Sequence, residues 1–262
     1  MEQLRERIEQ AFEEPAQVAD ERLRDDVGEV LDLLTEGRIR AASKENGAWV
    51  VHEWVKKAIL LHFRMHYMMP MEAGVLHFFD KVPVQGNWEG KGARVVPPAT
   101  VRHGAHVAKG TILMPSYVNI GAYVGGGTMV DTWATIGSCA QVGENCHISG
   151  GVGIGGVLEP LQAAPVIVED NCFVGARCEI AEGVRVAEGA VLAMGCYIGA
   201  STKIYDAVGG GKILHGEVPA GAVVVPGALP SKDGTHSTYA VIIKKYRDER
   251  TDAKTALNEI LR

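Results

Sequence analysis

An aliphatic side chain recurs every six residues through the middle of this chain. One run begins at Ile112, and a second, in a new frame, begins at Val168. The members are Ile112, Val118, Val124, Val130, Ile136, Val142, Ile148 and Ile154, followed by Val168, Val174, Ile180, Val186, Leu192, Ile198 and Ile204. Neither a helix of roughly 3.6 residues per turn nor an alternating strand has this period. The pattern predicts a solenoid in which each hexad supplies one short strand and one corner, with about three hexads per coil.

Small side chains complete the repeat. A small residue often stands four positions after the aliphatic one, and four cysteines share this slot: Cys146, Cys172, Cys178 and Cys196. We expect these four to be reduced core residues. Cys139 is one position out of step, and we expect it to be partly exposed.

Two interruptions break the six-residue count. Residues 156–167 replace two hexads plus two residues, and residues 205–217 contain the run Gly209-Gly210-Gly211, which predicts an inserted hairpin. Loops inserted in a solenoid commonly lie on its functional face.

The segments that flank the repeat have other periods. Helical spacing of apolar residues predicts helices over 4–12, 27–34 and 53–65, and Asn46-Gly47 predicts a turn between strands at 39–42 and 49–51. Residues 69–92 show no clear period. Residues 239–246 are typical of a strand and 251–262 of a short helix, and both would cover the open end of a solenoid.

The predicted protein is therefore mainly β. A parallel β-helix occupies residues 94–228, a mostly helical domain precedes it over 1–93, and a strand and helix cap follows over 229–262.

Composition narrows the possible partners. The net charge is −6 and the pI about 5.9, without the Lys/Arg-rich run that a nucleic-acid binder would show. The start, MEQLRERIEQ, lacks the apolar core of a signal peptide, and no stretch approaches the roughly 18 apolar residues that span a bilayer. We expect a cytoplasmic protein that binds neither nucleic acid nor membrane. Paired Cys-x-x-Cys spacing is absent, so we expect no zinc site.

Six longer motifs lie in and beside the repeat: RVVPPATVR from Arg94, LMPSYVNIGAYV from Leu113, MVDTWATIGSCAQVG from Met129, SGGVGIGGVLEPLQAAP from Ser149, VEDNCFVGARCEI from Val168 and LPSKDG from Leu229. They resemble the tetrahydrodipicolinate N-succinyltransferases of bacterial lysine and diaminopimelate biosynthesis. The helical N-terminal region and FDKVP from Phe79 also match, so the resemblance covers essentially the whole chain.

The resemblance implies a left-handed β-helix that assembles as a homotrimer with active sites between subunits. It implies succinyl transfer from succinyl-CoA, a co-substrate, to the amino group of ring-opened tetrahydrodipicolinate, with no tightly bound cofactor. The products would be N-succinyl-2-amino-6-oxopimelate and CoA. This chemistry needs a base for a proton of the amine or of water, and donors for the two substrate carboxylates. The hand agrees with the strict hexad, which right-handed β-helices generally lack.

Two acidic residues are the catalytic candidates. Asp131 stands where the hexad usually has glycine, so by pattern alone it is either a corner cap or a catalytic group. Glu179 ends its hexad and points outward, where an ordinary solvated acid would also stand. The resemblance favours catalysis for both, and it makes Arg94 the clamp for a substrate carboxylate, which suits a guanidinium fork.

Weaker candidates complete the expected site. The resemblance suggests Asn119, Trp133 and Gly156, with Asp131, for the substrate pocket. Lys203 is a candidate for the phosphates of succinyl-CoA, although an ordinary solvated lysine would look the same. A phosphate loop of the Walker type is absent from the sequence.

The spacing of the two acids leads to a geometric expectation. Asp131 and Glu179 are 48 positions apart, and the interruption at 156–167 adds two residues beyond whole hexads. The remainder is slightly more than two and a half coils, so we expect the two carboxylates on different faces of one chain. They could then meet only between neighbouring subunits.

Three other functions remain open. A different hexapeptide acyltransferase would keep the fold and change the donor or the acceptor. A γ-type carbonic anhydrase would need three histidines that converge on zinc between subunits, but His103, His106 and His147 lack coil-related spacing. A non-enzymatic solenoid would show regular coils without the interruption at 156–167 and without an outlier such as Asp131.

Overall fold

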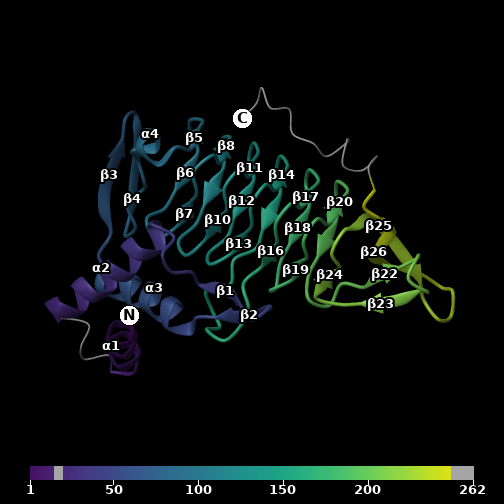
Figure 1. Ribbon diagram of the computed structural model, residues 1–262, viewed down its shortest axis with the longest axis horizontal. Helices are drawn as coiled ribbons and strands as arrows, with labels where there is room; N and C mark the ends of the chain where they lie inside the picture. The colour runs from purple at the N-terminus through teal and green to yellow at the C-terminus, as the bar shows by residue number, and fades with distance from the viewer. Residues whose placement is uncertain (15–19, 249–262) are drawn as a thin grey trace.

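A three-sided prism of short parallel strands makes up most of the molecule (Figure 1). The computed structural model describes residues 1–14 and 20–248. The prism lies along the long axis of the molecule, with the N-terminal helices beside its first coils and a hairpin of long strands at its far end.

Each side of the prism is one parallel sheet, to which every third strand of the solenoid belongs. Sheet 1 contains β7 (His106–Val107), β10 (Tyr123–Val124), β13 (Gln141–Val142), β16 (Ile167–Val168), β19 (Arg185–Val186) and β24 (Glu217–Val218). Sheet 2 contains β5 (Arg94–Val95), β8 (Ile112–Leu113), β11 (Met129–Val130), β14 (His147–Ile148), β17 (Phe173–Val174) and β20 (Val191–Leu192). Sheet 3 contains β6 (Thr100–Val101), β9 (Tyr117–Val118), β12 (Thr135–Ile136), β15 (Gly153–Ile154), β18 (Glu179–Ile180) and β21 (Tyr197–Ile198). The predicted stack of hexads is confirmed.

The second residue of each of these strands generally points into the prism, where stacked aliphatic side chains form one continuous core. The four cysteines expected in small interior slots are buried there as free thiols. One position of the pattern is wrong: Leu113, rather than Ile112, pairs with Val130 and belongs to this core. The step from Leu113 of β8 to Val118 of β9 is therefore one residue shorter than a hexad.

The helical domain has a second core. It contains α1 (Glu2–Glu13), α2 (Glu21–Thr35) and α3 (Glu53–Met65), and α3 has the expected range. Ile120 and Cys139, from one corner of the prism, pack into this core. Cys139 is fully buried, so the expected partial exposure is wrong. The helices cover the corner, and burial raises the pKa of this thiol to about 12.

Two hairpins accompany the helices. The expected one turns at Asn46-Gly47 and consists of β1 (Ala42–Glu45) and β2 (Ala48–Val51), so its first strand begins at Ala42 and not at residue 39. The other consists of β3 (Met69–Ala73) and β4 (Leu76–Asp80), in a segment without a readable period, and a short helix α4 (Trp88–Lys91) follows.

The interruption at 156–167 is a loop at one corner, and no strand of the prism is missing there. Val142 pairs with Val168, whereas Val124 pairs with Val142, so this coil is eight residues longer than the preceding one. The expected replacement of two hexads is wrong, because the chain resumes pairing at the next strand position. The buried Lys56 of α3 donates a hydrogen bond of 2.7 Å from Nζ to the Ala163 carbonyl, which fastens the loop.

The far end of the prism carries antiparallel strands. β22 (Ile204–Asp206) and β23 (Lys212–Leu214) form the predicted inserted hairpin, and β25 (Ala222–Pro230) pairs with β26 (Ser237–Tyr246) to extend sheet 2. The domain boundary expected after residue 228 falls within β25. The helix expected over 251–262 lies outside the described residues. In the part of the chain that the structure describes, no helix is both long and apolar enough to cross a membrane.

Candidate active site

The outer surface of sheet 3 carries Glu179. Register pairing stacks Thr135, Gly153, Glu179 and Tyr197 on successive rungs. Their inward neighbours, such as Ile180, are buried, whereas Glu179 is exposed. The alternation of the strand therefore points this carboxylate outward, as expected.

Asp131 lies at the corner between sheet 2 and sheet 3. It directly follows β11, and its backbone N–H donates to the Ile148 carbonyl at 2.8 Å. Its Oδ1 accepts hydrogen bonds from the backbone N–H of Thr132 at 2.6 Å and from the Thr132 hydroxyl at 3.1 Å. These contacts are those of a corner cap and orient one carboxylate oxygen of Asp131. The catalytic role of the side chain stays a prediction.

The structure corrects the expected placement of the two acids. Asp131 leads into β12, and Glu179 lies two rungs further on the same sheet, so they border one surface rather than different faces. The miscounted interruption at 156–167 caused the error. Two rungs of about 4.8 Å still separate the backbones of the two coils by roughly 10 Å along the prism.

Trp133 belongs to the same corner as Asp131. Its side chain is 65% exposed, its φ is +60°, and its backbone N–H donates to the Pro115 carbonyl at 2.6 Å. Two coils further, Arg177 occupies the corresponding position, and its guanidinium lies over Gly151 of the intervening coil. The sequence did not single out Arg177 as a candidate, although it stands two residues before Glu179 in the motif GARCEI.

His147 is a neutral group near Asp131. It lies on β14, and its ring stacks on Phe173 with 4.9 Å between centroids. Burial lowers the pKa of His147, and the negative charge of Asp131 opposes this shift. The imidazole is therefore uncharged near neutral pH.

Arg94 lies on sheet 2, towards the N-terminal end of the prism. It is exposed on β5, two rungs from Met129, which precedes Asp131 by two residues. An extended side chain of Arg94 can cover much of the distance to Asp131 along the outer surface.

The other candidates lie further away. Asn119 Oδ1 accepts from Arg102 Nη1 at 3.1 Å and from the Ile120 N–H at 2.9 Å, at the edge of sheet 3 opposite to Asp131. Gly156 shares that edge, where a Cβ would overlap the backbone nitrogen of Ser138, so close packing also accounts for this glycine. Lys203 is exposed near the far end, and its carbonyl accepts from the Val241 N–H.

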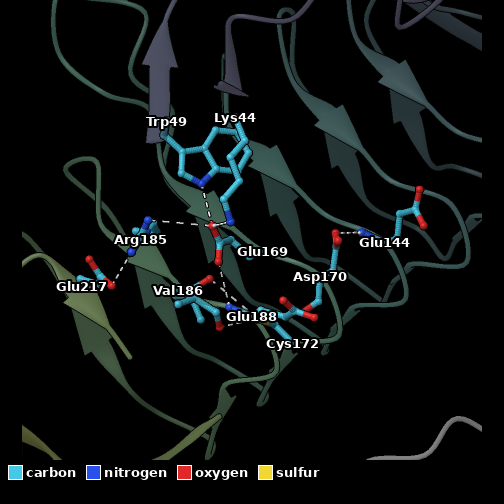
Figure 2. A network of polar contacts seen from close by, with 11 residues as sticks. Lys44, Trp49, Glu144, Glu169, Asp170, Cys172, Arg185, Val186, Glu188 and Glu217 are labelled. Carbon is cyan, nitrogen blue, oxygen red and sulfur yellow. Dashed lines mark hydrogen bonds and ion pairs between the residues drawn. The ribbon is translucent and has the colours of Figure 1, made fainter. Parts of the chain in front are cut away.

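A cluster of charged residues around Glu169 fastens the β1–β2 hairpin to the prism (Figure 2). Glu169 Oε1 accepts from the Trp49 indole at 2.7 Å and from Lys44 Nζ at 3.1 Å. Burial alone would raise the pKa of Glu169, but these hydrogen bonds outweigh it and hold the pKa below its usual value. Arg40 lines the same cavity of about 320 Å³ and stacks on Tyr123. The cluster anchors the helical domain to sheet 1, away from Asp131 and Glu179.

Comparisons with known proteins decide the family. Residues 3–65 match the family described as "Tetrahydrodipicolinate N-succinyltransferase N-terminal", and residues 165–200 match "Hexapeptide repeat of succinyl-transferase". The chain is 56% identical to 2,3,4,5-tetrahydropyridine-2,6-dicarboxylate N-succinyltransferase of Idiomarina loihiensis, over 100% of this chain and 99% of that protein. It is 58% identical to the protein of the same name from Acinetobacter baylyi, with the same coverage. This chain belongs to that N-succinyltransferase family.

A solved N-succinyltransferase structure supports the fold. It is described as a putative 2,3,4,5-tetrahydropyridine-2-carboxylate N-succinyltransferase from Campylobacter jejuni. The TM-score is 0.55 at 20% identity, over 84% of this chain and 62% of that one.

The structure also bears on the carbonic anhydrase hypothesis, which requires histidine ligands for zinc. Among the described residues, no group of three or more His, Cys, Asp or Glu side chains could hold a metal ion. His106 instead stacks on Tyr123 and contacts the Thr35 carbonyl, and His103 pairs with Asp32. Within one chain, both histidines therefore have other partners.

Proposed function

We propose that this protein transfers the succinyl group of succinyl-CoA to the amino nitrogen of ring-opened tetrahydrodipicolinate. The products are N-succinyl-2-amino-6-oxopimelate and CoA, in lysine and diaminopimelate biosynthesis. Full-length identity to named N-succinyltransferases carries the proposal. The exposed carboxylate of Glu179 and the oriented carboxylate of Asp131, on one surface, supply groups that this chemistry needs.

The acyl-transfer step moves one proton from the amine nitrogen to the sulfur of CoA. The cyclic imine first adds water and opens, which frees the amine. The amine nitrogen then attacks the thioester carbon, the new C–N bond forms and the nitrogen loses a proton. The C–S bond breaks, and CoA leaves as a thiolate that takes up a proton. Asp131 and Glu179 are the groups that we assign to accept and return protons.

The separation of these acids supports a site shared between subunits. Both acids must contact groups of one small substrate, and hydrogen-bond contact needs heavy atoms within about 3 Å. Within one chain the backbones of the two acids are two rungs, roughly 10 Å, apart, and Asp131 lies at a corner of the prism whereas Glu179 lies on the outer surface of sheet 3. We infer that left-handed prisms pack side by side in a homotrimer, and that each cleft takes Asp131 from one subunit and Glu179 from the next.

The remaining assignments concern binding. Arg94 forms a fork with a substrate carboxylate, Trp133 offers its exposed ring as a wall of the pocket, and Asn119 and Gly156 lie at the other edge of the surface. Lys203 pairs with phosphates of succinyl-CoA, which acts as a co-substrate in the cytoplasm and not as a bound cofactor.

A coupled assay tests the proposal. Purified protein is given succinyl-CoA with tetrahydrodipicolinate or 2-aminopimelate, and thiol release is followed with and without the acceptor. We expect acceptor-dependent release, and the Asp131→Asn variant is the matched control. Folded protein that releases no thiol with either acceptor would contradict the assignment. Faster release with acetyl-CoA than with succinyl-CoA would favour a hexapeptide acyltransferase with another donor.

A further inference from the structure

One position on the outer surface of sheet 3 has no side chain. The outward residues of successive rungs are Thr100, Tyr117, Thr135, Gly153, Glu179 and Tyr197. Five of these six carry side chains, so the strand geometry accepts a Cβ at this place. Gly153 has no left-handed backbone angle that would demand glycine. The absent side chain must therefore have a reason outside the backbone.

The carboxylate of Glu179 takes the space. A Cβ added to Gly153 would overlap both carboxylate oxygens of Glu179 and its Cδ, well inside the 3.0 Å that real Cβ contacts respect. The side chain of Glu179 thus folds back from its own rung and lies flat over Gly153 of the preceding rung. Neighbouring Arg177 does the same over Gly151, with Nη1 at 2.6 Å from the position of a Cβ.

Building on the proposed function, we propose that Gly153 is a positioning residue for the Glu179 carboxylate. Glu179 is exposed, and the extended side chain of an exposed glutamate has many rotamers. The bare surface at Gly153 leaves room for the one in which the carboxylate lies along sheet 3, over the preceding rung. A methyl group at this place displaces the carboxylate by about 1 Å, and such a displacement of a reacting group can lower a rate about 100-fold.

The fold itself does not depend on this glycine. The atoms that a methyl would meet are the far end of a flexible, exposed side chain, which can move away at little cost. The Gly153→Ala variant is therefore expected to keep the unfolding temperature of the wild type. Gly28→Ala in α2, where a Cβ meets nothing within 4 Å, is the matched control for the chemical change.

A double-mutant cycle on the full-length protein tests the proposal. Gly153→Ala should lower kcat about 10- to 100-fold with little change in the KM for succinyl-CoA. In the Glu179→Gln background, at high enzyme concentration, the same substitution should change the residual rate less than about twofold, because it acts through Glu179. Gly28→Ala should leave the rate unchanged. Crystal structures of wild type and Gly153→Ala should show the carboxylate displaced.

The contrary outcomes are distinct. A fully active Gly153→Ala variant, or one with an undisplaced carboxylate, overturns the positioning role. Equal losses of rate in the wild-type and Glu179→Gln backgrounds, or a fall in unfolding temperature that accounts for the loss, show a structural role and also overturn it. If the proposed function is wrong, the wild-type protein will show no acceptor-dependent thiol release. The displacement of the carboxylate in the crystal can still be measured in that case.

Discussion

Complementation between two inactive variants tests the shared site most directly. Asp131→Asn and Glu179→Gln each remove one carboxylate and preserve the shape of the side chain. Within one chain the backbones of the two acids are two rungs apart, roughly 10 Å along the prism. In the proposed homotrimer, either variant alone has three defective clefts.

Mixed trimers should regain some intact clefts. A cleft is intact when the Glu179→Gln subunit supplies Asp131 and the Asp131→Asn subunit supplies Glu179. Random assembly from an equal mixture gives this arrangement in about one quarter of clefts, so about one quarter of the wild-type activity should return.

The assay is thiol release after the two variants are dissociated together and allowed to reassemble. Each variant treated alone is the control, and the wild type treated alone gives the recovery of the procedure. If both variants are inactive alone and the reassembled mixture, with trimers present, is equally inactive, the two carboxylates do not meet between subunits.

Three further measurements follow from the structure. Arg94→Ala should raise the acceptor KM about 10- to 100-fold, from a lost charged contact of roughly 1.5–3 kcal/mol, with little change for succinyl-CoA; an unchanged acceptor KM would make Arg94 a surface charge. Cys139, with a pKa of about 12, should stay unlabelled by thiol reagents at about pH 8 in the native protein, and prompt labelling would contradict its burial. Burial and neighbouring His66 lower the pKa of His62 to about 4, so the unfolded chain binds the extra proton first. The free energy of unfolding should fall as pH falls from 6.5 towards 4, and His62→Gln should flatten that slope in denaturant titrations; an unchanged slope would assign it to other groups.

The hexad period predicted the architecture of the prism because its cause is local. Each six-residue unit places one aliphatic residue inward, and stacking equal units leaves only a solenoid that buries them all. The same regularity identified Asp131, which stands where other hexads have glycine, and placed Glu179 on an outward position. Motif resemblance then predicted a chemical role for both residues, which the period could not do.

The tertiary structure alone decided how distant segments meet. The chain after the loop at 156–167 could resume pairing at any strand, and only the pairing of Val142 with Val168 places Asp131 and Glu179 along one surface. Cys139 looked exposed by its register, but helices from the other end of the chain cover that corner. Gly153 looked like any other glycine of a Gly-rich repeat until the side chain of Glu179, 26 positions later, was seen to lie over it. A repeating pattern records which way each side chain points, whereas what it meets there depends on chain segments that the pattern does not contain.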